Sequence, residues 1–103
     1  MMLHVDCPSM WRNNASLAIV GEMPYADEIR LGASFVGRAG KLLDRLLSVA
    51  QLDRERVSLT HVVQRALPNF SSFYSKHKPS DELLAWRALL NEQLYTHGVQ
   101  VAV

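Results

Sequence analysis

The sequence predicts a three-layer α/β/α fold, in which helices cover both faces of a short parallel sheet. Short apolar or β-branched runs at 17–22, 57–63 and 99–103 have the length and composition of buried strands. Two longer segments, 39–51 and 80–97, repeat apolar residues every three or four positions, as amphipathic helices do. Because strands and helices alternate along the chain, we expect right-handed crossovers between parallel strands.

All 103 residues (1–103) are expected to form a single domain, because 49% of them are hydrophobic and can build one core. The formal net charge is only +1, so any binding of phosphate groups has to come from a local cluster of basic residues. The sequence contains neither an apolar run long enough to span a membrane nor an N-terminal signal peptide. We therefore expect a cytoplasmic protein that has no membrane partner.

The N-terminal segment 1–16 shows no clear periodicity and is expected to be an extended arm that leads to the first strand. It carries Cys7, the only cysteine, so the chain can form neither an internal disulfide nor a metal site with four cysteine ligands. The unbroken apolar run of the strand at 17–22 favours burial on both faces of the sheet. Pro24 prevents this strand from continuing as a central member of the sheet.

Two glycine-containing turns, at 21–25 and 32–37, separate the first strand from the helix predicted at 39–51. Gly40, near the start of this helix, leaves room for a close approach by backbone or ligand. The helix is amphipathic, and its apolar face is expected to pack on the sheet. That face consists of Leu42, Leu43, Leu46, Leu47 and Ala50, and the polar face consists of Lys41, Asp44, Arg45 and Ser48.

The strand predicted at 57–63 is followed by a segment, 66–79, that is rich in turn-forming residues and is predicted to be a loop. Three aromatic residues lie in this segment, namely Phe70, Phe73 and Tyr74. Either their rings anchor the loop on the domain, or one of them stacks on an unpaired nucleobase.

The second predicted helix has clear signals at both ends. Ser80 is the predicted N-cap, and Asp81 and Glu82 lie in the first turn, where the helix dipole favours anions. Gly98 is the residue type that commonly follows the last turn of a helix. The helix is therefore expected to end near His97.

The segment 17–40 also begins a motif that has two parts. The first part is Gly21-Glu22-x-Pro24, with a second acid, Glu28, six residues after Glu22. The second part is Gly32-x-x-Phe35-Val36-Gly37-x-Ala39-Gly40-x-Leu42-Leu43-Asp44. These residues resemble the N-terminal half of the uracil-DNA glycosylase superfamily. The most similar branch is the iron–sulfur type with its phage-related, polymerase-associated members, and the similarity runs from Leu17 to the last residue.

The resemblance implies a sheet with the strand order 2-1-3 and a fourth strand beside the third, which this sequence lacks. The strand at 99–103 would then be an exposed apolar edge, and proteins normally cover such edges. We expect either that the chain is a truncated piece of a longer fold or that another chain covers this edge. The covering chain would be a second copy, through self-association, or a protein partner.

The resemblance further implies hydrolysis of the N-glycosidic bond of uracil in DNA, after the base has been taken out of the stack. In the family, an acid at the position of Glu22 directs the attacking water, and a ring at the position of Phe35 stacks on the base. Met23 stands where another branch has its catalytic Asp, so only Glu22 could supply the negative charge. The alternatives are that Glu22 caps loop amides and that Phe35 anchors a loop.

The remaining base-pocket residues implied by the resemblance are Gly21, Met23, Pro24, Tyr25, Glu28 and His61. Tyr25 matches a tyrosine that shields the site from the methyl group of thymine, and its alternative is a tyrosine packed in the core or loop. Glu28 would organise the loop or contact substrate, and its alternative is a solvated acid. His61 stands where the family usually has an Asn that reads the uracil edge. A histidine presents only one ring nitrogen to an edge, so we expect altered or weakened recognition, or else a histidine satisfied within the core.

Arg30 and Arg38 flank the central turn and are the candidate contacts to the DNA backbone, with a solvated surface as the alternative. The resemblance also implies cysteines that hold an iron–sulfur cluster. Arg65 and Trp86 stand at two of those positions and Cys7 is alone, so we expect no cluster, no other metal and no cofactor. Trp86 is expected to fill the vacated space as part of the core.

The sequence ends before the family's second motif, a His-containing loop that stabilises the charge developing on the uracil carbonyl. Together with the exchange at His61, this predicts a uracil-DNA glycosylase-like protein that is weak or inactive as the chain stands. Its expected partner is DNA, either uracil-containing or single-stranded. The alternatives are a catalytically inert binding module for DNA or for a replication or host protein, and a pocket for a nucleotide or another small molecule.

Overall fold

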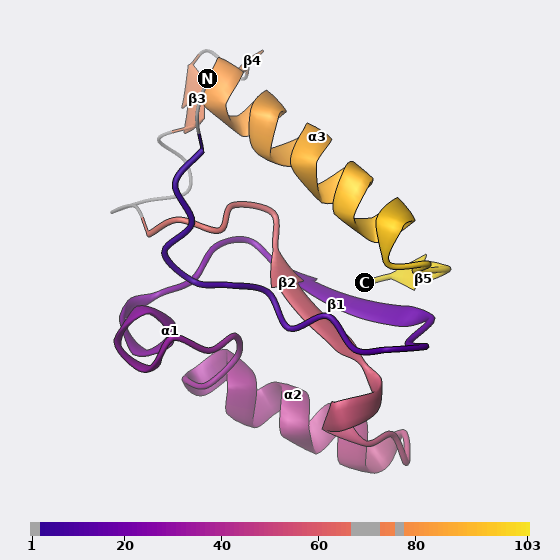
Figure 1. Cartoon of the computed structure of the whole chain (residues 1–103). Coiled ribbons are helices and arrows are strands. Elements are labelled where there is room, and N and C mark those ends of the chain that lie inside the picture. Colours follow the sequence, from indigo (N-terminus) through magenta and orange to yellow (C-terminus); the bar gives the residue numbers. More distant parts are fainter. Residues whose placement is uncertain (1–2, 67–72, 76–77) are drawn as a thin grey trace.

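The computed structural model describes residues 3–66, 73–75 and 78–103. In chain order its elements are β1 (Leu17–Gly21), α1 (Ala26–Leu31), α2 (Arg38–Val49), the 3₁₀ turn η1 (Arg54–Arg56), β2 (Ser58–His61), β3 (Tyr74–Ser75), β4 (Lys78–Pro79), α3 (Asp81–Thr96) and β5 (Val101–Ala102). Figure 1 shows β1 and β2 between α2 on one side and α3 on the other, which confirms the predicted α/β/α fold. None of the helices in the described ranges is long and apolar enough to span a membrane.

The central sheet contains β2, β1 and β5 in that spatial order, and both pairs of neighbours are parallel. In the ladder between β1 and β2, Ala18 pairs with Ser58 and Gly21 pairs with His61. In the ladder between β1 and β5, Leu17 pairs with Val101. This topology confirms the parallel sheet and the strand order 2-1-3. It also places Gly21 and His61 side by side at the carboxyl ends of two neighbouring strands.

One apolar core lies between the sheet and α2. Leu43 and Leu47 of the helix are buried and pack in one cluster with Leu59 of β2. The predicted apolar face of this helix is wider than the buried one, because Leu42 and Leu46 are each 57% exposed. The side chains at these two positions are rotated toward solvent by the helical repeat, so only one row of leucines reaches the sheet.

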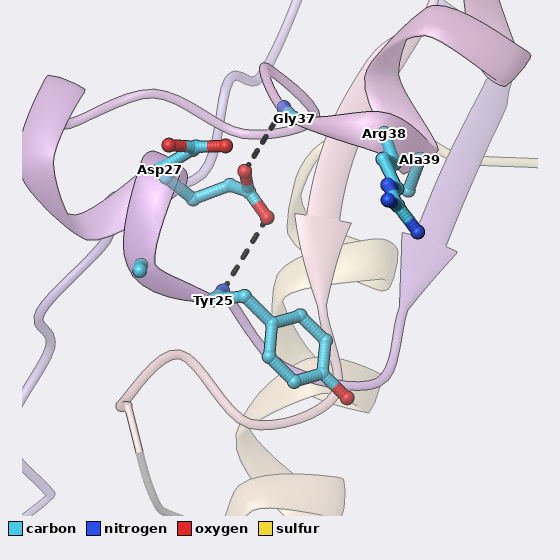
Figure 2. Close-up of a pocket in the computed structure, with 7 residues that line it drawn as sticks. Tyr25, Asp27, Gly37, Arg38 and Ala39 are labelled. Atoms are coloured by element: carbon cyan, nitrogen blue, oxygen red, sulfur yellow. Dashed lines mark hydrogen bonds between the residues drawn. The ribbon is translucent and has the colours of Figure 1, made fainter.

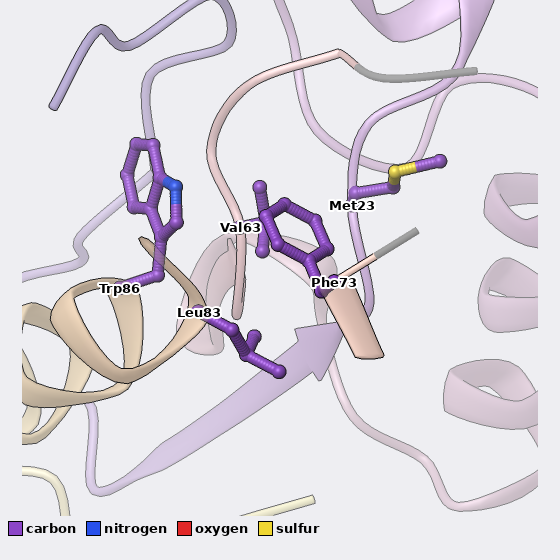
Figure 3. Packing of buried hydrophobic residues seen from close by; sticks show 5 residues of the cluster. All are labelled: Met23, Val63, Phe73, Leu83 and Trp86. Carbon is purple, nitrogen blue, oxygen red and sulfur yellow. The ribbon is translucent and has the colours of Figure 1, made fainter. Parts of the chain in front are cut away.

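A second core lies on the α3 side of the molecule (Figure 3). Its buried side chains are Met23, Val63, Phe73, Leu83 and Trp86. Trp86 is fully buried and its Nε1–H donates a hydrogen bond of 3.4 Å to Glu82, which confirms the prediction that Trp86 belongs to the core. Phe73 is 3% exposed, which confirms that this ring anchors its segment on the domain. Phe70, the first aromatic residue of the same segment, lies outside the described residues.

The described part of the N-terminal arm, from residue 3, runs along the outer edge of β2 and contains a turn at Asn13 and Asn14. Met10 and Leu59 form an antiparallel bridge, with N–O distances of 2.8 Å from the Met10 amide and 3.0 Å from the Leu59 amide. The hydroxyls of Ser9 and Thr60 are hydrogen bonded at 2.6 Å in the same region. The arm therefore covers one edge of the sheet.

The opposite edge of the sheet, formed by β5, is open within the described part of the chain. Val101 and Val103 are 55% and 70% exposed. Their amides donate to the carbonyls of Ser16 and Ala18, on the β1 side of the strand. This edge is the exposed apolar edge that the sequence predicts.

Two predictions about local structure are wrong. The helix α1 forms between the two turns, where no helix was predicted, because six residues are too few to show a helical repeat. It ends at Gly32, whose φ of 66° lies in the left-handed region that favours glycine. The segment 66–79 is not wholly a loop, because β3 and β4 pair within it as an antiparallel ribbon. Strands of two residues are held by backbone bonds and leave no pattern of side chains to recognise.

Candidate functional site

Three of the residues predicted to form the site meet at the carboxyl ends of β1 and β2. A Cβ atom added at Gly21 would lie 2.8 Å from Cδ2 of His61 and 3.1 Å from Cζ of Phe35. Both rings therefore come so close to the backbone of β1 that a larger residue at position 21 would displace one of them. The structure brings Gly21, Phe35 and His61 together although they are far apart in the sequence.

Phe35 lies in the loop between α1 and α2 and has a φ of 56°, in the left-handed region. This conformation costs a residue other than glycine roughly 1–2 kcal/mol, so the surroundings have to hold it in place. The ring stacks on the imidazole of His61, with 5.2 Å between the ring centroids and 11° between the ring planes. Phe35 keeps an intermediate exposure, so its ring is not wholly enclosed by the core.

His61 is 3% exposed, and burial lowers the pKa of its imidazole to about 4. The side chain is therefore neutral near pH 7. Its Nδ1 atom is buried and has no hydrogen-bond partner among the residues that the structure describes. The imidazole is therefore buried with one ring nitrogen unpaired in the described chain, and an unpaired buried polar atom costs about 1–3 kcal/mol.

Glu22 follows β1 directly and has an exposed side chain. Its backbone carbonyl accepts a hydrogen bond of 3.0 Å from the amide of Val63. Within the described residues, its carboxylate has neither a hydrogen-bond partner nor an ion pair, so it does not cap loop amides there. The carboxylate is consequently available to water and to a ligand.

Glu28 has the amide-binding role that Glu22 lacks. Glu28 is 5% exposed, which excludes the solvated acid, and its carboxylate accepts hydrogen bonds from the amides of Tyr25, at 3.3 Å, and Gly37, at 3.1 Å. The two bonds are the dashed lines in Figure 2. Because Tyr25 precedes α1 and Gly37 precedes α2, this one side chain joins the two turns of the motif. Glu28 is thus positioned to organise the loops.

An open cleft of about 440 Å³ lies beside this junction (Figure 2). It is lined by Tyr25, Ala26, Asp27, Glu28, Gly37, Arg38 and Ala39. Tyr25 is 56% exposed, so it is not a core tyrosine. The lining does not include Phe35, His61 or Glu22, so the cleft and the pair of stacked rings are two neighbouring features connected through the loop that contains Gly37.

The other predicted site residues differ in their exposure to solvent. Met23 and Pro24 are buried, and Met23 packs in the core on the α3 side, so both support the turn from inside. Arg38 is exposed beside the cleft. Arg30 is also exposed and forms an ion pair of 3.3 Å with Asp27, which contributes little because both side chains are solvated.

The residues at the positions of the implied cluster ligands do not fit an iron–sulfur cluster. Arg65 forms an ion pair of 2.8 Å with Glu82, and Trp86 is buried among apolar side chains. Cys7 is buried as well, and burial raises the pKa of its thiol, which disfavours the thiolate that binds metal. Across 3–66, 73–75 and 78–103, no group of three His, Cys, Asp or Glu residues could hold a metal ion.

Sequence reasoning missed one residue of this region. Arg54 lies in η1, between α2 and β2, and its guanidinium donates to the backbone of the Phe35 loop at 2.7 and 2.8 Å. A contact between a side chain and backbone carbonyls about twenty positions away leaves no periodic signal in the sequence.

Residues 8–103 match the family described as the Uracil DNA glycosylase superfamily. The chain is 35% identical over 88 residues to the type-4 uracil-DNA glycosylase of Saccharolobus solfataricus, an alignment that covers 84% of this chain and 38% of that protein. It is 42% identical over 62 residues to the corresponding protein of Archaeoglobus fulgidus, which covers 60% of this chain and 31% of the relative. The chain thus spans about a third of the length of these relatives. Since the family match extends over most of the sequence and the parallel sheet agrees with it, the chain belongs to the uracil-DNA glycosylase superfamily.

Proposed function

We propose that this protein binds a uracil that has been taken out of DNA and hydrolyses its N-glycosidic bond, with low activity. One observation carries the proposal. The Phe35 ring is held in a left-handed loop against Gly21, and the next residue of the chain, Glu22, has an exposed carboxylate. A stacking surface and a free acid thus lie at the same end of β1. The relatives named above, which are uracil-DNA glycosylases, support the same reaction.

The reaction needs one water molecule and no cofactor. The oxygen of water bonds to the anomeric carbon of the deoxyribose while the bond from that carbon to N1 of uracil breaks. Glu22 orients the water, accepts its proton and favours positive charge on the sugar, and uracil leaves with the electron pair of the broken bond. Phe35 holds the departing base by stacking on its face.

Low activity follows from the chemistry of His61. A neutral imidazole has one donor and one acceptor on opposite parts of the ring, so it cannot offer the paired donor and acceptor that suit the edge of uracil. The lowered pKa, about 4, prevents a second donor from appearing near pH 7. Binding of uracil and discrimination against other bases are therefore both reduced.

The DNA backbone is proposed to pass over Arg38 and Arg30, with Tyr25 between the backbone and the base. Arg38 has no ion-pair partner in the described chain, and the exposed pair between Arg30 and Asp27 is easily exchanged for a phosphate contact. Replacing either arginine by Gln should weaken binding of single-stranded DNA of any sequence and lower its dependence on salt.

A uracil-release assay on single-stranded DNA tests the reaction. The wild-type chain should release uracil, and Glu22→Gln, which keeps the shape of the side chain but removes its charge, should lower the rate by about a hundredfold or more. Glu92→Gln is the matched control, because Glu92 is also an exposed glutamate and lies on α3, outside the proposed site. Equal rates for wild type and Glu22→Gln would contradict the proposed role of Glu22.

A second candidate function is a catalytically inert module that binds DNA. The observation in its favour is His61, whose buried Nδ1 and stacked ring provide little for reading a base edge. Fluorescence anisotropy with matched oligonucleotides that contain uracil or thymine at one position separates the candidates. Equal affinities together with no uracil release, even with protein in excess, would support the inert module and contradict the enzyme.

The open edge of β5 supports a proposal about assembly. The amides of Val101 and Val103 point toward β1, so the amide and carbonyl of Ala102 point outward by the alternation of a strand. Two such edges related by a two-fold axis can pair in antiparallel fashion, with each Ala102 donating to and accepting from the other. Sedimentation should therefore show a dimer that Val101→Lys dissociates, whereas Val49→Lys, at a position 84% exposed on α2, should leave it intact. A wild-type chain that stays monomeric at high concentration would contradict this pairing.

A further inference from the structure

We infer that Arg54 is a positioning residue that holds the Phe35 ring in the orientation used for stacking on a base, an inference that rests on the proposed function. The guanidinium Nη2 donates to the carbonyl oxygens of Ser34, at 2.8 Å, and Phe35, at 2.7 Å. Its Nη1 donates to the Asp44 carboxylate at 2.8 Å. One side chain thus connects three points around the loop that carries the ring.

The Phe35 loop needs such a connection because its backbone conformation is unfavourable by itself. With Phe35 in the left-handed region, the carbonyls of Ser34 and Phe35 both face Arg54 and accept from the same nitrogen. The carbonyl of Phe35 is also pressed against α2, because a Cβ atom at Gly40 would overlap it. Two close carbonyl oxygens repel each other, and a positive group between them removes that repulsion.

Asp44 makes the arrangement electrically neutral. The Arg54 side chain is 25% exposed, so its charge is partly removed from water, and the salt bridge with Asp44 compensates for this loss. Asp44 lies on α2 and Arg54 lies in η1, immediately before β2. The contact therefore links the helix that follows Phe35 to the segment that leads into β2, the strand that carries His61.

The rigid, planar guanidinium of arginine suits this role, and the ammonium group of lysine does not. Arginine has several N–H groups in a fixed plane, so it can bond two carbonyls and a carboxylate at once, whereas a lysine ammonium is a single compact charge on a flexible stem. Arg54→Lys keeps the charge and removes the geometry. It is therefore the informative substitution, and Arg54→Met, which keeps an unbranched apolar stem without charge, is the second variant.

The first measurement needs no DNA. The Phe35 ring lies over His61, with 5.2 Å between centroids, so its ring current should shift the carbon-bound ring protons of His61 upfield in the NMR spectrum. In Arg54→Lys and Arg54→Met these protons should move toward ordinary histidine positions while the rest of the amide spectrum stays dispersed. An unchanged His61 shift in both folded variants would overturn the inference, whatever the protein does with DNA.

The second measurement uses single-stranded DNA that contains 2-aminopurine, whose fluorescence is quenched when it stacks on an aromatic ring. Arg54→Lys should lose most of the quenching and bind about tenfold more weakly, with the salt dependence of binding unchanged because the charge is retained. Asp44→Asn, which leaves both carbonyl bonds in place, should keep most of the quenching. Quenching in Arg54→Lys equal to that of wild type would also overturn the inference.

A further variant tests the base-binding role of Phe35 independently of the positioning role of Arg54. Phe35→Leu should abolish the quenching if Phe35 is the stacking ring. Full quenching in Phe35→Leu would contradict the base-binding role of Phe35 and leave the NMR result to decide the role of Arg54. Unfolding temperatures of all variants, measured alongside, identify any substitution that acts only by unfolding the chain.

Discussion

The carbonyl oxygen of Phe35 occupies the space that a Cβ atom at Gly40 would require. The first turn of α2 thus packs directly on the backbone of the loop that presents the ring, and this contact is closer than any other residue at position 40 allows. The sequence predicts a close approach at Gly40 by backbone or ligand, and the structure shows that the approaching group is backbone. Helix α2 therefore packs directly against the loop that carries Phe35, one of the two stacked rings.

Gly40→Ala should destabilise the fold and disturb the rings together. Overlap of the new methyl group with a backbone carbonyl outweighs the better helix propensity of alanine, so we expect a net loss of about 2 kcal/mol in the free energy of unfolding. Urea denaturation monitored by circular dichroism measures this loss. Ser48→Ala, at an exposed position of the same helix, should change stability by less than about 0.5 kcal/mol. Wild-type stability in Gly40→Ala would show that the loop can move away without cost.

Glu28→Gln should loosen the junction between the two turns. The carboxylate accepts one amide hydrogen bond on each oxygen, whereas a glutamine side chain has a single oxygen and so leaves one buried amide without an acceptor. We expect a loss of about 1–3 kcal/mol, measured by urea denaturation, and faster amide exchange at Tyr25 or Gly37.

Asp27→Asn is the matched control for Glu28→Gln, because it makes the same chemical change one residue earlier. The Asp27 side chain is 56% exposed and its ion pair with Arg30 is solvated, so this substitution should have little effect on stability. Equal losses in the two variants would mean that the buried bonds of Glu28 contribute no more than a surface charge.

The main strands and helices of this fold could be predicted from the sequence, because their apolar residues recur in patterns typical of buried strands and helices. The strands β1, β2 and β5 and the helices α2 and α3 all carry a repeated apolar pattern, and each was predicted within a few residues of its observed bounds. The helix α1 and the ribbon β3–β4 carry no such pattern. They depend on a left-handed Gly32 and on backbone pairing, which are visible only in three dimensions.

The part of the candidate site that follows from the pairing of strand ends could be predicted from the sequence. The part that depends on contacts of single side chains could not. Gly21, Phe35 and His61 converge because the parallel register sets Gly21 opposite His61. The different environments of Glu22 and Glu28, one exposed and one buried, follow from the way the two turns fold together. The bonds from Arg54 to the Phe35 loop depend on the same folding, so no pattern in the sequence could indicate them.

Removal of the N-cap of α3 should cost a predictable amount. The Ser80 hydroxyl accepts a hydrogen bond of 3.2 Å from the amide of Leu83, in the first turn of the helix. Ser80→Ala leaves that amide without a side-chain acceptor and should lower stability by about 1 kcal/mol, whereas Ser80→Asp should retain it. Thermal unfolding of the two variants side by side measures the difference. A loss in Ser80→Asp as large as that in Ser80→Ala would assign the effect to something other than the cap.

The buried imidazole of His61 makes the fold sensitive to acid. Its pKa is about 4 in the folded chain and about 6.5 when unfolded, so between these values the unfolded state binds more protons. Stability from this group is therefore fully present above about pH 6.5 and is lost as the pH falls toward 4. At pH 5 the expected loss relative to pH 7.5 is about 2 kcal/mol.

Effects of pH on the rest of the chain are common to wild type and to a variant at position 61, so the prediction concerns a difference between two chains. His61→Gln keeps a polar side chain of similar length and cannot be protonated, so its stability should fall less between pH 7.5 and pH 5 than that of wild type, by about 2 kcal/mol. Urea denaturation of both chains at the two pH values gives this difference directly. Equal losses of stability in the two chains would contradict the prediction. They would mean that the folded chain protonates His61 as readily as the unfolded chain does, although Nδ1 has no partner in the described residues and the ring stacks on Phe35.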